Sequence, residues 1–235
     1  MQRCFRGPLS RALLIVLLVA CCCGSAWAQW RWTPQTRRWI NVSNLPKETP
    51  ELQLEYARSL MLEGRYSEAL KQTEKFAKFY NDTEFADDNQ FLRAEIQLRQ
   101  GNLSKAAEEF QQVVVNYPDS DLYSQVIEKQ YAVGDGFYDK GLRKQDQKWT
   151  LFKNRPFKRA IDVYTMVINN QPFTRAAAEA QYKVGLCHYT RAEYMEAAYE
   201  YRRVIEDYST SEWVDDAQYG LAMCYYKGSR PPEYD

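Results

Sequence analysis

The sequence has very little histidine, with His188 as its single example in 235 residues. Without a second histidine there is no metal-ligand cluster of the usual spacing, no Ser-His-Asp set and no HExxH motif. His188 falls where the repeat described below places a packed side chain, so we assign it to the core. Gly134-Asp135-Gly136 falls inside an expected helix and does not follow a strand, so it is not a phosphate loop. The sequence therefore predicts no enzyme and no metal or other cofactor.

Cysteine is scarce beyond the first 28 residues. Of six cysteines, four belong to that segment, and only Cys187 and Cys224 follow it. Both occupy the same position of successive equivalent helices, whose axes pack about 8 to 10 Å apart. That separation exceeds the Cα distance that a disulfide tolerates. We therefore expect two small, unpaired core side chains.

Long hydrophobic runs are also absent after residue 28. Before it, Arg3, Arg6 and Arg11 precede an apolar run that is too short to span a bilayer as a stable anchor, Leu13 to Ala20. Residues 1–28 are thus predicted to be an export signal. Either cleavage follows Ala28, or Leu18-Val19-Ala20-Cys21 acts as a bacterial lipobox and leaves Cys21 as a lipidated N-terminus. In both cases membrane contact is expected only through a lipid anchor or a partner.

No large excess of charge of one sign is expected in the chain after the signal is removed. The full sequence has 31 Lys+Arg and 31 Asp+Glu, and removing the three signal arginines leaves 28 against 31, a net charge of −3. Nucleic-acid binding requires a strongly basic surface, so this balance argues against nucleic acid as a partner.

Residues 29–49 show no helical periodicity but hold three tryptophans and two prolines: Trp30, Trp32, Trp39, Pro34 and Pro46. This composition predicts an extended tether between the membrane side and the rest of the chain. Alternatively, its tryptophans dock onto the first repeat.

Five glutamines recur at one place in a two-helix pattern, with spacings of 37, 40, 51 and 37 residues: Gln53, Gln90, Gln130, Gln181 and Gln218. This period is close to that of tetratricopeptide units with slightly long connections. If each glutamine is position 4 of its unit, a buried small residue falls at position 20 of the second helix, at Ala69, Ala106, Ala160 and Ala197. The agreement predicts an all-α superhelical solenoid of antiparallel helix pairs.

The spacing of 51 has a local cause. In three units a small residue ends the first helix five positions before the alanine, at Gly64, Gly101 and Ala192. In the third unit Gly141 precedes Ala160 by 19 positions, so 14 extra residues, 142–155, are expected in the turn. The predicted units are about 50–83, 87–120, 127–174, 178–211 and a half unit at 212–228, within an array of 50–235.

Three motifs extend the likeness to tetratricopeptide proteins: Ala86-Asp87-Asp88-Asn89-Gln90-Phe91-Leu92-Arg93-Ala94, Asn116-Tyr117-Pro118-Asp119-Ser120 and Val214-Asp215-Asp216-Ala217-Gln218-Tyr219. With the export signal, they resemble the BamD/ComL family of outer-membrane assembly lipoproteins from about Leu52 to Asp235. The resemblance implies a scaffold at the periplasmic face of the bacterial outer membrane. Its implied partners are a barrel insertase, other subunits of that assembly complex and unfolded outer-membrane protein segments.

Periplasmic coordinators of peptidoglycan and Tol-Pal work share much of this motif, so an adaptor for cell-wall enzymes is the alternative. A third reading, an accessory domain of an enzyme encoded beyond residue 235, also stays open. The sequence has a fifth first helix at about 211–227 without a second helix after it. We expect either a fragment of a longer protein or a partner that covers Leu221, Cys224 and Tyr225.

The candidate site is a groove lined by positions 5 and 12 of each first helix. These positions change from aliphatic residues to tyrosine along the array. Tyrosine offers flat apolar area with a hydroxyl, which suits an extended aromatic-rich peptide. The expected binding residues are Phe91, Tyr131, Tyr138, Tyr182, Tyr189, Tyr219 and Tyr226. The alternative is that these side chains fill space between helices.

Position 2 is acidic in every unit, which the helix dipole explains without a ligand. The 14-residue insertion holds five basic residues, one acid, Trp149 and Phe152. It is a candidate contact for an acidic partner surface or lipid headgroups. Alternatively, Trp149 and Phe152 fold back onto the third repeat.

Overall fold

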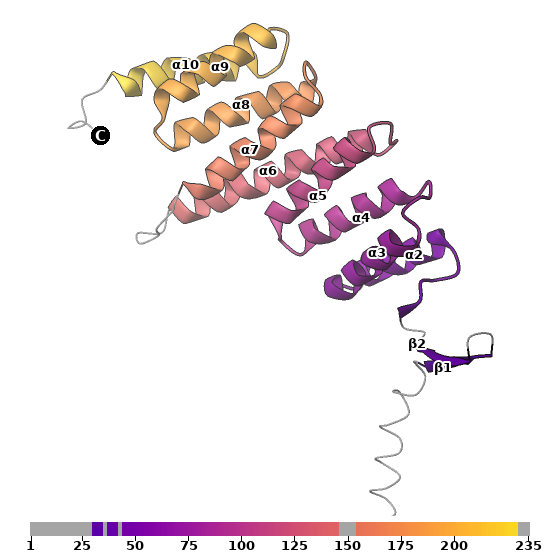
Figure 1. The fold of residues 1–235 in the computed structure, drawn as a ribbon. Helices are drawn as coiled ribbons and strands as arrows, with labels where there is room; N and C mark the ends of the chain where they lie inside the picture. The colour runs from indigo at the N-terminus through magenta and orange to yellow at the C-terminus, as the bar shows by residue number, and fades with distance from the viewer. Residues whose placement is uncertain (1–29, 35–36, 42–43, 146–153, 230–235) are drawn as a thin grey trace, which may run out of the picture. The chain divides into compact units, whose positions relative to one another are not determined.

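A computed structural model describes residues 30–34, 37–41, 44–145 and 154–229. The chain divides into two compact units, residues 1–49 and 50–235. The first holds a small β-hairpin and the second holds all the described helices (Figure 1).

The hairpin pairs β1 (Trp30–Thr33) with β2 (Arg38–Asn41) in antiparallel order. Trp32 lies opposite Trp39, and Trp30 lies opposite Asn41. Trp30 and Trp32 are two positions apart, which places them on one face of an extended strand. The segment expected to be an unpaired tether is thus folded back on itself, since aromatic residues favour paired strands.

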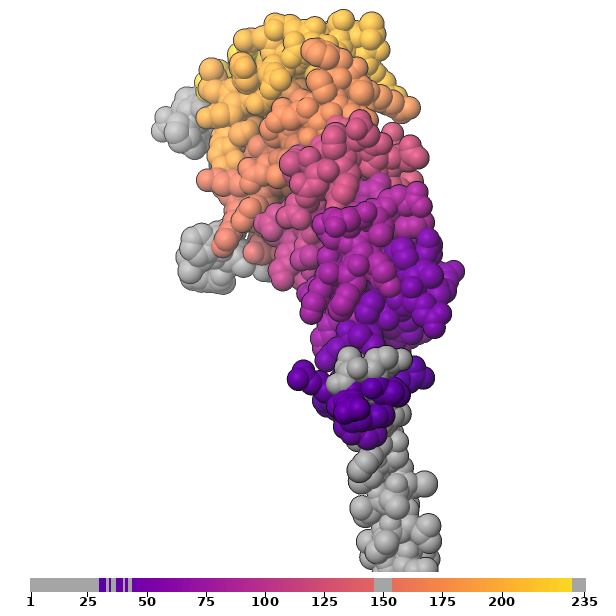
Figure 2. Space-filling model, turned by 45° about the vertical axis from the view of Figure 1, so that its right-hand side comes forward, coloured from indigo at the N-terminus to yellow at the C-terminus, as the bar shows by residue number. Residues whose placement is uncertain are grey.

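Nine α-helices follow among the described residues and pack as sequential antiparallel pairs, which confirms the all-α class and the repeat architecture. The pairs are α2 (Pro50–Leu62) with α3 (Tyr66–Phe79), α4 (Ala86–Arg99) with α5 (Leu103–Asn116), α6 (Tyr123–Gln145) with α7 (Arg155–Asn170), and α8 (Arg175–Thr190) with α9 (Tyr194–Asp207), followed by α10 (Val214–Gly228). In the space-filling view their colours succeed one another in chain order along the array (Figure 2). Helices α6 and α8 begin before the units predicted to start at 127 and 178.

The turns inside the pairs depend on a left-handed residue. Gly64 and Gly101 have φ angles of 76° and 81°, and Ala192 takes the same conformation with a φ of 61°. A left-handed residue after the last turn is a common helix stop. The small residues picked out by the repeat therefore act through their backbone conformation in three units.

Gly141 acts differently, because α6 continues through it to Gln145. A Cβ at Gly141 would lie 2.6 Å from ring carbons of Phe157 on α7. The position requires glycine because the Phe157 ring packs against it. The helix stop expected at Gly141 was wrong, since α6 continues to Gln145. Residues 142–145 of the expected insertion are helical, and 146–153 lie outside the described residues.

The core is built from the alanines of the second helices and their aromatic neighbours. Ala69, Ala106, Ala160 and Ala197 are all fully buried. One apolar cluster joins α2, α3 and α4, a larger one extends from α4 to α8, and a third joins α9 and α10. Cys187 and Cys224 are buried and unpaired, which confirms their assignment to the core. His188 is half-buried, with its Nδ1 2.8 Å from Glu193 Oε2.

Candidate partner-binding surface

The recurring glutamines fasten the two helices of a repeat together. The Gln53 amide donates to the Gln72 backbone and side-chain oxygens at 3.0 and 3.1 Å. Gln90 donates to Glu109 Oε2 at 2.6 Å, and Gln181 donates to Glu200 Oε2. Each acceptor lies 19 residues after its glutamine. In these three pairs the glutamine therefore marks an interhelical hydrogen bond that fixes the register of the two helices.

The third repeat uses a different partner. Adding 14 inserted residues to the offset of 19 places the equivalent acceptor at Val163, which cannot accept a side-chain bond. Gln130, fully buried, instead donates to Gln111 Oε1 of α5 at 2.9 Å. Asn170 of α7 donates to Gln130 Oε1 at 2.9 Å and to Gln111 Oε1 at 3.0 Å. A cluster of three amides, of which Gln130 is fully buried, thus joins the second repeat to the third.

Four of the predicted groove tyrosines are half-buried against aromatic rings of a second helix. Their ring centroids lie 5.5 to 5.6 Å from those of their neighbours, in the pairs Tyr131 with Tyr164, Tyr138 with Phe157, Tyr182 with Tyr201, and Tyr189 with Tyr194. Tyr182 is also stacked on Trp213, with centroids 5.0 Å apart. These side chains fill space between helices and offer only part of each ring to a partner.

Two of the half-buried tyrosines, Tyr131 and Tyr138, also interact with polar or charged side chains. The Tyr131 hydroxyl donates to Glu179 Oε1 of the next repeat at 2.7 Å. Burial and then this hydrogen bond raise the pKa of Tyr131. Lys183 Nζ lies 3.2 Å from Asp135 Oδ1 and 5.8 Å from the centroid of the Tyr138 ring. Glu179, one of the acids at position 2, therefore has a structural role between repeats.

The exposure of the predicted groove residues differs between the two ends of the array. Phe91 is 9% exposed and packs against Phe110, with ring centroids 5.6 Å apart. By contrast, Tyr219 is 69% exposed and Tyr226 is 49% exposed on α10. They are seven residues apart, so they share one face of the helix. The predicted binding residues thus divide into a packed set and an accessible α10 tyrosine face, Tyr219 and Tyr226.

The predicted contacts Trp149 and Phe152 lie outside the described residues. Beside that segment, a cavity of about 250 Å³ is lined by four basic residues and no acid: Lys140, Lys144, Arg155 and Arg159. A second cavity of about 410 Å³ shares Ser104, Phe137 and Arg159 and extends between α5 and α7. Sequence analysis found Lys144 and Arg155 in the insertion but missed Lys140 and Arg159, because only the helix pairing brings them together.

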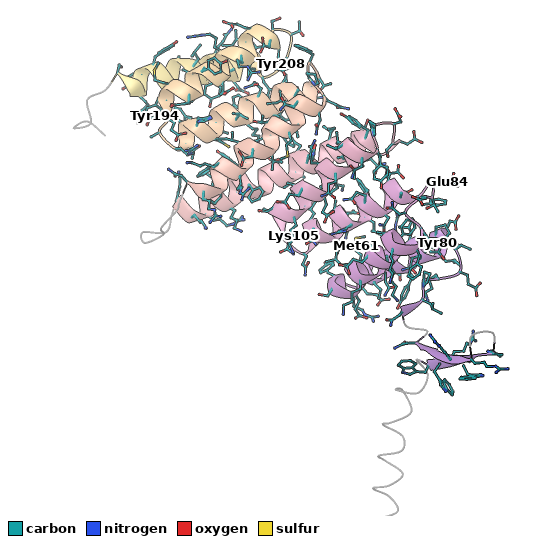
Figure 3. All side chains as sticks on the ribbon, viewed as in Figure 1. Met61, Tyr80, Glu84, Lys105, Tyr194 and Tyr208 are labelled. Atoms are coloured by element: carbon teal, nitrogen blue, oxygen red, sulfur yellow. The ribbon has the colours of Figure 1, made fainter. Side chains whose placement is uncertain are left out.

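A further cavity, of about 480 Å³, lies where the turn before α8 meets the turn before α10. Phe173 is 80% exposed there with a φ of 62°, a rare backbone conformation for an aromatic residue. Its ring centroid lies 6.3 Å from that of Tyr208. Tyr208 and Tyr194 mark the two ends of α9 (Figure 3). Sequence analysis missed this site, since no periodic position marks a turn.

The residues that the structure describes contain neither a metal-binding cluster nor a membrane-spanning helix. No group of three or more His, Cys, Asp or Glu side chains there is arranged to hold a metal ion. In the same residues, no helix combines the length and apolarity needed to cross a membrane.

Solved structures with a similar helical arrangement come from several sources. A thermophilic tetratricopeptide protein of Thermus thermophilus is 16% identical, with a TM-score of 0.37, over 77% of this chain and 84% of its own. A tetratricopeptide protein of Parabacteroides merdae is 16% identical with a TM-score of 0.45, over 76% of this chain and 59% of its own. The protein MamA is 18% identical with a TM-score of 0.44, over 77% of this chain and 83% of its own. A search of curated proteins gave no match.

A sequence profile of the tetratricopeptide repeat matches residues 88–120 and 179–211. These stretches hold most of the α4–α5 and α8–α9 pairs, which the glutamine hydrogen bonds fasten at the same offset of 19. Repeats of this kind typically bind other proteins and are not catalytic. The chain therefore carries tetratricopeptide repeats in these two stretches.

Proposed function

We propose that this protein is a non-catalytic periplasmic scaffold in outer-membrane β-barrel assembly. It binds a barrel insertase and receives unfolded segments of barrel precursors. The proposal is supported by the export signal of residues 1–28 and by the motif resemblance over 52–235. The observation that carries it is the α10 tyrosine face, where Tyr219 and Tyr226 remain accessible while the other groove tyrosines are packed.

This face suits an extended, aromatic-rich peptide. Two tyrosine rings seven residues apart provide flat apolar area about two helical turns long, at a low cost in side-chain entropy. Tyr225, on the same helix, accepts a hydrogen bond from Arg202 Nη2 at 2.6 Å. That contact holds one neighbouring ring in place beside the face.

The peptide test uses the α10 tyrosine face directly. Tyr219→Ala combined with Tyr226→Ala should weaken binding of a synthetic terminal-strand peptide about tenfold or more, because both rings lose contact area. Tyr199→Ala is the matched control, since Tyr199 is 60% exposed but lies on α9. The helical circular dichroism signal should stay intact in both. Equal affinity of the double variant and the parent would refute the peptide site.

The partner test uses the chain in its own host. Membranes extracted in mild detergent should yield a barrel insertase with the purified protein, identified by mass spectrometry. Peptidoglycan enzymes or Tol-Pal components in place of the insertase would instead support the adaptor. Purification without either class would remove both.

A further inference from the structure

One face of the β-hairpin consists of three tryptophans and Asn41. Trp30, Trp32 and Trp39 share this face through the strand register, and they are 53%, 45% and 62% exposed. Trp32 and Trp39 form a cross-strand pair with ring centroids 5.8 Å apart and planes at 61°. Three exposed indoles on so small an element form a concentrated apolar surface, which we call the tryptophan face.

Two of the four register positions that alternate with the tryptophan face are basic. Arg31 and Arg38 lie at the register positions of the opposite face. Around them, residues 29–47 hold four Lys or Arg and no Asp or Glu: Arg31, Arg37, Arg38 and Lys47. The hairpin therefore combines a local positive charge with an aromatic face, although the chain from Gln29 onward has a net charge of −3.

A bilayer surface matches both properties. Tryptophan is enriched at the boundary between headgroups and acyl chains, where its ring is covered and its N–H group stays hydrated. Basic residues beside such a face are attracted to anionic headgroups. An isolated two-stranded hairpin is only marginally stable in water. Covering three indoles would therefore also stabilise the hairpin.

We propose that the hairpin is a membrane-surface anchor that lies in the interface of an anionic bilayer, with the tryptophan face toward the acyl chains. Its arginines then remain at the level of the headgroups. The inference does not rest on a role in barrel assembly. It adds a direct lipid contact to the two attachments expected from sequence, a lipid anchor and a partner.

The position of the hairpin in the sequence fits either processing route. Trp30 lies nine positions after Cys21, a stretch of at most about 32 Å when fully extended. A lipid on Cys21 would thus hold the hairpin close to the bilayer. After cleavage at Ala28, Trp30 would be the second residue, and the hairpin would be the direct contact with lipid.

Vesicle flotation of the unlipidated chain from Gln29 tests this anchor. The probes are vesicles of phosphatidylcholine alone and of equal parts phosphatidylcholine and phosphatidylglycerol. The parent should float with the anionic vesicles, with a shift of tryptophan emission to shorter wavelength. Trp32→Ala combined with Trp39→Ala should reduce partitioning about tenfold or more. Tyr199→Ala, on the array, should change nothing.

Two further measurements test the contribution of the basic residues and whether the tryptophans are accessible to lipid. Arg31→Gln should weaken partitioning into anionic vesicles about fivefold and leave the neutral vesicles unaffected. Absence of binding to both vesicles, or equal flotation of the double tryptophan variant, would overturn the proposal. The proposal would also be overturned if acrylamide did not quench the tryptophan emission without lipid and lipid did not change this result, since the array would then cover the tryptophans. Circular dichroism of the helices verifies that each variant is folded.

Discussion

The ring of Tyr201 on α9 packs directly on the backbone of Gly185 on α8. A Cβ added to Gly185 would lie 2.8 Å from both Cδ1 and Cε1 of that ring, and a Cβ at Gly220 of α10 would lie 2.7 Å from Cε2. Tyr164 and Gly134 form the same contact one repeat earlier, at 2.6 Å. Two helices can therefore approach this tyrosine only where they lack a side chain.

Gly185→Ala should destabilise the array by about 1 to 3 kcal/mol, because the methyl group overpacks the Tyr201 ring. Chemical unfolding followed by circular dichroism measures the change. Gly228→Ala is the control: its Cβ would meet only the Tyr194 Cβ, at 3.8 Å, so no loss is expected. In a Tyr201→Thr background the Gly185→Ala penalty should shrink. An unchanged penalty there would disprove the assigned clash.

Gln130→Leu should cost about 1 to 3 kcal/mol, because the variant removes the buried member of the amide cluster and leaves polar groups of Gln111 and Asn170 with fewer partners. The equivalent change at Gln218, which is exposed on α10, should be close to neutral. Urea unfolding compares the two. Similar losses at both positions would show that leucine at position 4 is itself unfavourable, independent of the cluster.

The array should lose stability in alkaline solution. Burial raises the pKa of the Tyr164 and Tyr201 hydroxyls above the ordinary 10.0 in the folded state. Above pH 10.0 the unfolded chain loses these protons first, so stability present below that pH declines as pH rises. Each such group contributes about 1.4 kcal/mol per pH unit while only the unfolded form is ionised. Tyr201→Phe should flatten the decline measured by urea unfolding, and an equally steep decline would contradict this origin.

The two core thiols should be unreactive while the chain is folded. Burial raises the pKa of Cys187 to about 12 and that of Cys224 to about 11. Since the thiolate is the reactive form, a disulfide reagent at neutral pH should modify the folded chain from Gln29 very slowly. Unfolding in guanidinium should expose both thiols to rapid reaction. Fast modification of the folded chain would mean that α8 or α10 opens readily.

The helix pairs were predictable because their causes are local and periodic. Equivalents of Gln53 and Ala69 recur at fixed positions of the repeat. Gly64 and Gly101 stop helices by their own backbone conformation. Gly141 carries the same letter for another reason, the Phe157 ring. A glycine in a sequence does not reveal which of the two it serves, so the length of α6 was missed.

The site was less predictable, because exposure depends on what the neighbouring helix contributes. Tyr182 and Tyr219 hold the same repeat position, yet Tyr182 is stacked on Trp213 and Tyr219 is 69% exposed. The hairpin was missed because strands of four residues give too short a periodicity to stand out around Pro34. The four basic residues around the 250 Å³ cavity come together only after α6 and α7 pair.

The hydrogen bond from Gln130 to Gln111 of the preceding repeat affects how the protein responds to force. Gln53, Gln90 and Gln181 each tie helices within one repeat, whereas Gln130 joins α6 to α5 across a repeat boundary. A chain pulled from its two ends would therefore not extend in equal steps. We expect the second and third repeats, which the amide cluster joins, to yield together as one longer rupture.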